Sequence, residues 1–245
     1  MQKKKKWKRV LLTIFLVICM LAGALGIYAG RYYHMDETAQ EALLADKEVS
    51  IDEDQKGTIA FIPNQKIKAG LIFYPGAKVE YTAYAPLMKK FAEDGILCVL
   101  VKMPLNIAIL DINAADGIEN KFPQVENWYI GGHSLGGAVA SMYCAKHVDD
   151  FKGEILLAAY SIKDVSDTDL NIALIHGSDD QVLNMKSYEK YRNKVPDTAE
   201  EVVIEGGNHC QFGNYGFQKG DGEAEISAEE QQKQAAEAVE KLINE

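Results

Sequence analysis

A serine flanked by glycines stands between an apolar run and a run of small residues. Residues 128–137 read WYIGGHSLGG, in which Gly132, Ser134 and Gly136 form a Gly-x-Ser-x-Gly pattern. A serine hydroxyl is a weak nucleophile near neutral pH, so it must be exposed and placed beside a base. A strand, a sharp turn and a helix in this order supply the exposure, because glycine lets the two elements approach closely. The pattern predicts that Ser134 is a nucleophile.

A histidine follows a later apolar run, in the chain order that such a serine requires. His209 ends the sequence Gly-Gly-Asn-His, directly after the run that closes at Ile204. At the carboxyl end of a strand its imidazole can reach Ser134, so we expect it to act as general base and then as general acid. His133 stands next to Ser134 inside the turn and points away from the serine side chain, so it is not a candidate base.

The acid that orients this base has three candidates. Asp179 and Asp180 follow the apolar run that ends at Ile175, and only one of these neighbours can point at His209. Asp180 is the preferred acid because Gln-Val follows it and would start the next turn. Asp179 and Asp164 remain the alternatives.

Backbone N–H groups near the serine can stabilise negative charge on a reacting oxygen. We expect the Leu135 N–H, at a helix N-terminus, to be one donor and the Ala77 N–H to be the other. Gly76 precedes Ala77 and lets the backbone approach a substrate closely. Tyr81 and Tyr84 are candidates for the pocket wall or for the core.

The longest connection near the predicted site runs from residue 208 to 225 and contains Phe212 and Gly-Asp-Gly at 220–222. It is either a wall of the substrate pocket or a surface loop. Only about ten residues, 161–170, separate two of the predicted strands, so we expect no sizeable cap domain and an open site.

Apolar runs alternate with helical patterns along most of the chain, which predicts a three-layer α/β fold with a mainly parallel sheet. The expected strands are 58–62, 69–74, 96–101, 128–131, 154–159, 172–175 and 201–204. The expected helices are 84–93, one within 106–120, one after Ser134, 186–194 and one beginning with the capping box of residues 227–230.

Charge is unevenly placed along the 245 residues. Residues 1–30 hold six of the 26 Lys and Arg residues and no Asp or Glu, so the remainder carries a formal charge of −16. Phosphate binding needs a basic face, so nucleic acid is not expected as a partner. The three cysteines after residue 30 (Cys98, Cys144 and Cys210) have no metal-ligand spacing, and no metal or organic cofactor is implied.

Residues 10–29 are uncharged and mostly apolar, which is the length a helix needs to cross a bilayer. Lysines precede this run and only Arg31 follows it, so the N-terminus is expected in the cytoplasm. The expected organisation is a basic segment (1–9), a transmembrane signal-anchor (10–30), a spacer (31–48) and a globular domain (49–245). The alternative is a cleaved signal peptide, although its apolar region is usually shorter.

Four motifs together resemble the α/β-hydrolase superfamily, and within it a small bacterial membrane-anchored group related to dienelactone hydrolases. They are Phe73–Gly76, Gly132–Gly137, His176–Asp180, and Gly206–His209 with Phe212-Gly213. The resemblance covers roughly residues 55–245. Dienelactone hydrolases proper use a cysteine nucleophile, whereas this chain has Ser134, so a dienelactone is not the expected substrate.

The expected function is an exported, membrane-tethered serine hydrolase that cleaves an ester or related acyl bond of a small or lipid-like substrate. Two alternatives remain open at this point. One is an envelope acyltransferase that uses the same triad, and the other is a binding module without catalysis on the same scaffold. Acyl chain length, natural substrate and oligomeric state do not follow from the sequence.

Overall fold

The computed structural model describes the backbone of residues 2–244, and side chains are described outside residues 1–5, 9, 10, 21, 22, 24, 25, 27, 29 and 245. The chain divides into two compact units, residues 1–32 and residues 33–245. The first unit contains helix α1 (Gln2–Ala29). Within the described residues, no helix combines the length and apolar character needed to cross a membrane. The structure therefore gives the predicted anchor at 10–30 no support, and part of that segment lies outside the described side chains.

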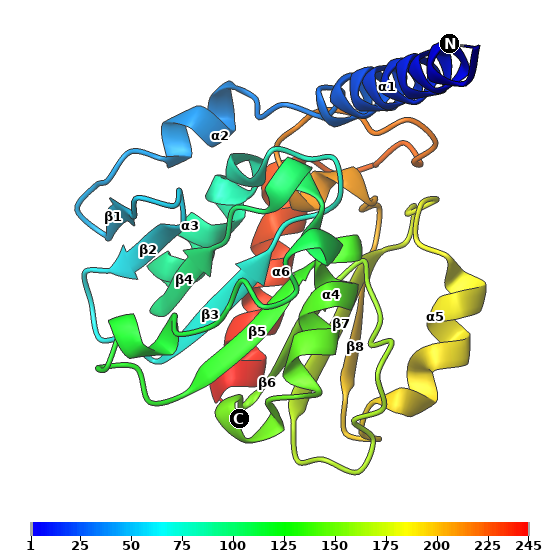
Figure 1. Cartoon of the computed structure of the whole chain (residues 1–245). Coiled ribbons are helices and arrows are strands. Elements are labelled where there is room, and N and C mark those ends of the chain that lie inside the picture. The colour runs from blue at the N-terminus through cyan, green and yellow to red at the C-terminus, as the bar shows by residue number, and fades with distance from the viewer. Residues whose placement is uncertain (1, 245) are drawn as a thin grey trace. The chain divides into compact units, whose positions relative to one another are not determined.

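The second unit is built on an eight-stranded sheet in the order β1-β2-β4-β3-β5-β6-β7-β8 (Figure 1). The strands are β1 (Val49–Glu53), β2 (Ile59–Pro63), β3 (Ala69–Tyr74), β4 (Ile96–Leu100), β5 (Trp128–His133), β6 (Gly153–Leu157), β7 (Asn171–Gly177) and β8 (Glu200–Ile204). The β1–β2 and β2–β4 pairs are antiparallel, and the other pairs are parallel. The carboxyl ends of β3 to β8 therefore lie along one edge.

Helices cover both faces of this sheet, so the predicted three-layer α/β fold is confirmed. They are α2 (Glu37–Ala42), α3 (Ala85–Glu93), α4 (Leu135–Cys144), α5 (Met185–Tyr191) and α6 (Ala228–Asn244). Side chains of α3 and α6 belong to one core cluster, and side chains of α4 and α5 belong to the other. In Figure 1, α4 lies in front of the sheet and α6 behind it. Residues 158–170, which join β6 to β7, contain no helix, so no cap domain is inserted there.

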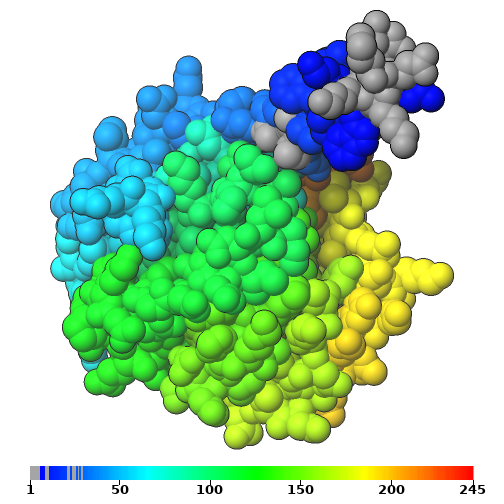
Figure 2. Space-filling view, viewed as in Figure 1, coloured from blue at the N-terminus to red at the C-terminus, as the bar shows by residue number. Residues whose placement is uncertain are grey.

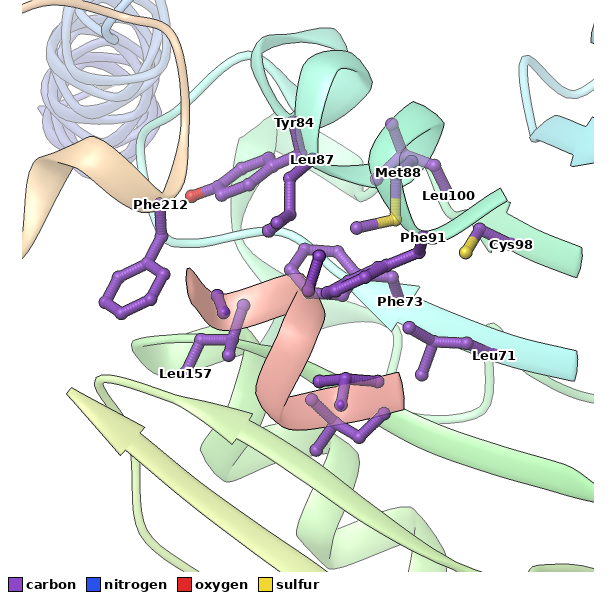
Figure 3. Close-up of a cluster of buried hydrophobic side chains, with 14 of the residues drawn as sticks. Leu71, Phe73, Tyr84, Leu87, Met88, Phe91, Cys98, Leu100, Leu157 and Phe212 are labelled. Atoms are coloured by element: carbon purple, nitrogen blue, oxygen red, sulfur yellow. The ribbon is translucent and has the colours of Figure 1, made fainter. Parts of the chain in front are cut away.

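Strand β3 shows how the sheet divides the core. Leu71 and Phe73 point to the side of α3, where they join Phe91 (Figure 3). Ile72 and Tyr74 point to the side of α4. Successive side chains of a strand alternate between faces, so a strand buried on both sides must be apolar throughout. Each fully buried large apolar side chain contributes about 1.5–3 kcal/mol to folding.

The prediction of a helix within residues 106–120 is wrong. This part of the chain forms short 3₁₀ turns at Pro104–Asn106, Ala108–Leu110 and Glu119–Lys121. The Tyr74 hydroxyl donates to the Ile112 carbonyl (2.8 Å) and accepts from the Ala115 N–H (2.9 Å), so these backbone groups bond to a side chain instead of forming a helical ladder. In Figure 2, the green middle part of the chain, which includes this segment, covers much of the visible face.

The predicted boundary at residue 49 also differs from the structure, because residues 33–48 pack on the domain. The Tyr33 N–H donates to the Lys78 carbonyl (2.7 Å), and the Asp36 N–H donates to the Asn214 carbonyl (2.9 Å). Ala39 of α2 is fully buried. Short charged segments resemble spacers in sequence, yet contacts with distant residues make this one part of the fold.

Glu154 is an acidic side chain near the start of β6 and is completely buried. Its two carboxyl oxygens have no hydrogen-bond partner among the described residues. Burial raises the pKa of Glu154 to about 7, and the neighbouring Cys144 thiol opposes this rise only in part. A buried carboxylate without a partner is costly, so the side chain is neutral at low pH and disfavours the fold when it ionises.

We expect Glu154→Gln to stabilise the protein at alkaline pH. The folded-state pKa lies above the unfolded value near 4.5, so the folded state binds more protons and wild type loses stability as pH rises from about 4.5 to 7. The loss is on the order of 3 kcal/mol at most. Urea unfolding at pH 5 and pH 8 should show the variant gaining over wild type at pH 8, while the exposed control Glu189→Gln follows wild type. Parallel pH profiles for wild type and Glu154→Gln would contradict the assignment.

Candidate active site

Ser134 lies at the carboxyl edge of the sheet, between the end of β5 and the start of α4. Its backbone has φ 53° and ψ −124°, a conformation that non-glycine residues rarely adopt and that is strained. The Ser134 N–H donates to the Leu157 carbonyl at 2.9 Å, which helps to hold the turn. A Cβ on Gly132 or Gly136 would collide with the Tyr74 carbonyl, so only glycine allows strand, turn and helix to pack this closely.

Asp180 and His209 form a hydrogen bond that is almost completely shielded from water. Asp180 Oδ2 lies 2.8 Å from His209 Nδ1, and the two side chains are 1% and 2% exposed. Asp180 Oδ1 accepts from the N–H groups of Val182 (2.9 Å) and Leu183 (2.8 Å), so both carboxylate oxygens have partners. With Nδ1–H donated to the carboxylate, His209 Nε2 is the nitrogen left to accept a proton.

The other two candidate acids are engaged elsewhere. Asp179 Oδ2 lies 3.3 Å from the hydroxyl of its own neighbour, Ser178. Asp164 is exposed and accepts from the hydroxyl of Ser166 at 2.7 Å within its own loop. Of the three, Asp180 is the carboxylate within hydrogen-bond distance of His209.

His209 lies beside the turn that carries Ser134. The ring of His133, the residue before Ser134, packs against the ring of His209 with 4.5 Å between centroids. The half-buried Ser134 hydroxyl makes no hydrogen bond within the part of the chain that the structure describes. Catalytic hydrogen bonds are often long in unliganded enzymes and tighten when substrate binds.

Asp221 is a buried carboxylate that sequence reasoning missed. Its Oδ1 accepts from the N–H groups of His209 (3.2 Å) and Gln181 (3.3 Å), and its Oδ2 accepts from the Cys210 N–H (2.8 Å). One side chain thus ties the loop of the acid to the loop of the base. Gly-Asp-Gly at 220–222 was the available signal, but nothing in the local pattern indicates which backbone groups this aspartate holds.

Gln231 of α6 supports the same loop from the other side. It is fully buried, its Oε1 accepts from the Asn208 N–H (2.9 Å), and its Nε2 donates to the Asn208 carbonyl (2.7 Å). This pair of hydrogen bonds resembles a strand pairing and fixes the backbone one residue before His209. The position of the imidazole therefore depends on a residue of α6 that lies 23 positions after Asn208.

The two expected oxyanion donors are the N–H groups of Leu135, directly after Ser134, and of Ala77, in the loop after β3. Leu135 is the first residue of α4, so its N–H has no partner within the helix. Ala77 is half-buried in the loop after β3, and its N–H makes no hydrogen bond with the described residues. The N–H of the preceding Gly76 donates to the Tyr84 hydroxyl at 3.1 Å. Gly76 therefore fits against a side chain, whereas the sequence suggested that it faces a substrate.

Tyr81 and Phe212, the other two candidates for substrate binding, are both buried. Tyr81 is buried, and the Lys102 ammonium lies 5.7 Å from its ring centroid. Phe212 is completely buried, with its ring centroid 5.7 Å from that of His133. Both belong to the core cluster on the α3 side. The residue types alone did not distinguish a pocket wall from a core.

No group of three or more His, Cys, Asp and Glu side chains in the described part of the chain is arranged to hold a metal ion. Cys98, Cys144 and Cys210 are free and buried. The arrangement of Ser134, His209 and Asp180 is suited to nucleophilic chemistry.

Comparisons with known proteins agree with this reading of the fold. Similar solved structures include Est1E from Butyrivibrio proteoclasticus (TM-score 0.57, 16% identity, 81% of this chain and 100% of that one). Another is a dienelactone hydrolase from Anabaena variabilis (TM-score 0.58, 12% identity, 80% of this chain and 98% of that one). A third is carboxyl esterase 2 from Tuber melanosporum (TM-score 0.58, 11% identity, 87% of this chain and 90% of that one).

A search of proteins with curated descriptions found no significant match. The sequence profile of the alpha/beta hydrolase family matches residues 70–233, which include the Ser134 turn, both loops at the carboxyl edge and the start of α6. The chain therefore belongs to the alpha/beta hydrolase family.

Proposed function

We propose that this protein is a serine hydrolase that cleaves an ester or a related acyl bond through an acyl-enzyme. The observation that carries the proposal is the shielded hydrogen bond between Asp180 and His209, beside the strained turn at Ser134. Membership of the alpha/beta hydrolase family and the similarity in fold to esterases support hydrolase activity. The roles of the individual residues are part of the proposal.

In the proposed reaction, Ser134 Oγ attacks the substrate carbonyl carbon while His209 Nε2 takes the hydroxyl proton. The carbonyl electron pair moves to oxygen, where the Leu135 and Ala77 N–H groups stabilise the charge. The intermediate collapses and expels the alcohol, which takes the proton from His209. Water then gives a proton to His209 and attacks the acyl group, so that the acid leaves and Ser134 regains its proton. Asp180 stays ionised and stabilises the imidazolium in both steps.

Apolar side chains around the carboxyl edge favour a substrate with an apolar group. Large hydrophobic residues are exposed on the connections that leave this edge after β4, β7 and β8: Leu105, Ile109, Leu110, Met185 and Phe217. No helix covers the edge between β6 and β7. We therefore propose an open site that accepts a small or lipid-like ester.

An open site also permits the acyl group to pass to an acceptor other than water, so an envelope acyltransferase is the second candidate. It would give a product whose formation depends on the acceptor, in place of free acid. A binding module without catalysis is the third candidate, and it differs from both enzymes in leaving Ser134 unreactive.

The N-terminal segment carries a further part of the proposal, which is that the domain is exported and tethered to the membrane. Its support is the uncharged tract 10–29 with basic residues before it. In a bacterium that expresses the full chain, alkaline phosphatase fused after residue 245 should be active and green fluorescent protein should be dark. The opposite pattern would place the domain in the cytoplasm.

We expect wild-type protein to react with a fluorescent fluorophosphonate and to hydrolyse p-nitrophenyl esters, because Ser134 is activated by His209. Ser134→Ala and His209→Ala should abolish labelling and lower kcat/KM by several orders of magnitude. Gel fluorescence and an ester series of rising chain length measure both effects. If folded wild type is not labelled, the binding module becomes the leading candidate.

Asp180→Asn should lower kcat by roughly three to four orders of magnitude, because an amide next to His209 Nδ1 favours the wrong tautomer and cannot stabilise the imidazolium. The matched variant Asp179→Asn changes a carboxylate whose one side-chain hydrogen bond among the described residues is to its neighbour Ser178, so its kcat should stay close to that of wild type. Steady-state kinetics with one ester compare the two. A larger effect at Asp179 would transfer the role to that residue.

A further inference from the structure

Three groups with no role in the proposed reaction lie together behind the Ser134 turn. The Tyr84 hydroxyl is 3.1 Å from the Gly76 backbone nitrogen and 2.8 Å from His133 Nδ1. Tyr84 and Gly76 are buried, and His133 is 1% exposed. Figure 3 shows the Tyr84 ring with its hydroxyl oxygen directed toward the segment that carries Phe212. A polar group at this depth needs a defined partner.

The direction of the first hydrogen bond is fixed, because the Gly76 N–H can only donate and the Tyr84 oxygen accepts from it. We assign the Tyr84 hydroxyl as donor to His133 Nδ1, which gives its own hydrogen a partner. In this assignment His133 is neutral and carries its hydrogen on Nε2. Burial, reinforced by the nearby His209, holds the pKa of His133 well below its usual range, in agreement with this state.

The other side of His133 touches the proposed base. The two imidazole rings pack at 4.5 Å between centroids, and His133 Nε2 has no hydrogen-bond partner within the described residues. The His209 backbone also lies close enough to His133 to influence its protonation. One side of this ring thus holds Tyr84, and the other supports the residue that moves the proton.

Gly76 supplies an independent observation. A Cβ built on Gly76 would lie 2.7 Å from the Tyr84 hydroxyl oxygen and 2.8 Å from His133 Nδ1. Such distances are too short for real side chains, so the loop after β3 rests directly on the Tyr84–His133 pair. That loop continues into Ala77, the proposed oxyanion donor. With the Gly76 N–H engaged by Tyr84, the next N–H along the loop is the one left for a substrate oxygen.

We propose that Tyr84 and His133 are positioning residues, which hold the Gly76–Ala77 loop and His209 in register on the two sides of Ser134. This inference rests on the proposed serine hydrolase reaction. The Tyr84 hydroxyl sets where the Ala77 N–H points, and the neutral His133 ring supports His209 without adding a positive charge beside it. Such placement matters most when charge develops on the substrate oxygen, so its loss lowers kcat and leaves KM nearly unchanged.

The test compares Tyr84→Phe and His133→Leu with His133→Asn in the full chain. Tyr84→Phe keeps the ring that packs against Phe73 and removes only the hydroxyl. Asparagine can offer its amide oxygen near the position of Nδ1, and leucine cannot. We expect Tyr84→Phe and His133→Leu to lower kcat about 10- to 100-fold with KM within about twofold, and His133→Asn to recover most of the loss. Fluorophosphonate labelling rates should follow kcat.

Tyr215→Phe is the matched control. It removes another buried tyrosine hydroxyl, one that bonds to Gln218 at 3.3 Å, outside the Gly76–Tyr84–His133 chain. Its kcat should remain near that of wild type. Thermal unfolding of every variant separates a loss of fold from a loss of positioning. If Tyr84→Phe or His133→Leu unfolds, the kcat of His133→Asn still tests the inference.

A double-mutant cycle decides whether the two residues act as one unit. If the hydroxyl acts through His133, Tyr84→Phe combined with His133→Leu should lose little more activity than either single variant. Additive losses, equal losses in His133→Asn and His133→Leu, or an unchanged labelling rate in Tyr84→Phe would each overturn the inference while wild-type labelling still supports a serine hydrolase. An unlabelled, folded wild type would instead overturn the proposed function.

Discussion

The hydrogen bond between Asp180 and His209 is the interaction on which the rest of the site depends. Both side chains are almost fully shielded from water, and removing a carboxylate from water is expensive unless every lone pair has a partner. The Val182 and Leu183 N–H groups supply those partners on the second oxygen. The carboxylate is therefore stable only while the turn after β7 keeps its shape and the loop after β8 keeps its position.

These two loops are held by side chains from distant parts of the chain. Asp221 accepts from the backbone of both loops, and Gln231 of α6 pairs with Asn208 next to His209. Such buried polar networks are strong when complete, because each hydrogen bond operates away from water. The short connection between β6 and β7 provides no cap, and the hydrogen bonds of Asp221 and Gln231 hold the loops of the site.

Two other buried polar groups lack this kind of satisfaction. Among the residues that the structure describes, Glu154 near the start of β6 has no hydrogen-bond partner, and His133 Nε2 has none beside His209. The first lies in the core beneath α4 and makes stability depend on pH. The second lies next to the proposed base, and Tyr84 engages its opposite nitrogen. Burying a polar atom without a partner is therefore costly at both positions, but only the His133 ring lies next to the site.

Much of the fold and the centre of the site could be predicted from local sequence. Continuous apolar runs such as Ala69–Tyr74 identify strands buried on both faces, because alternate side chains meet different helices. Gly132 and Gly136 identify the turn at Ser134, since the requirement for glycine is steric and local. His209 is recognisable for a similar reason, as it follows a strand within a glycine-rich loop.

Tertiary structure alone decided the rest. Asp180, and not Asp179 or Asp164, reaches His209 because the loop after β7 and the loop after β8 lie side by side at the carboxyl edge. In 106–120 the Tyr74 hydroxyl bonds to the backbone of Ile112 and Ala115, and Phe212 and Tyr81 belong to the core cluster on the α3 side. The roles of Asp221, Gln231 and Tyr84 likewise arise from contacts between residues far apart in the chain. Sequence patterns report the spacing of neighbours, whereas these contacts are created only when the parallel sheet brings its carboxyl ends to one edge.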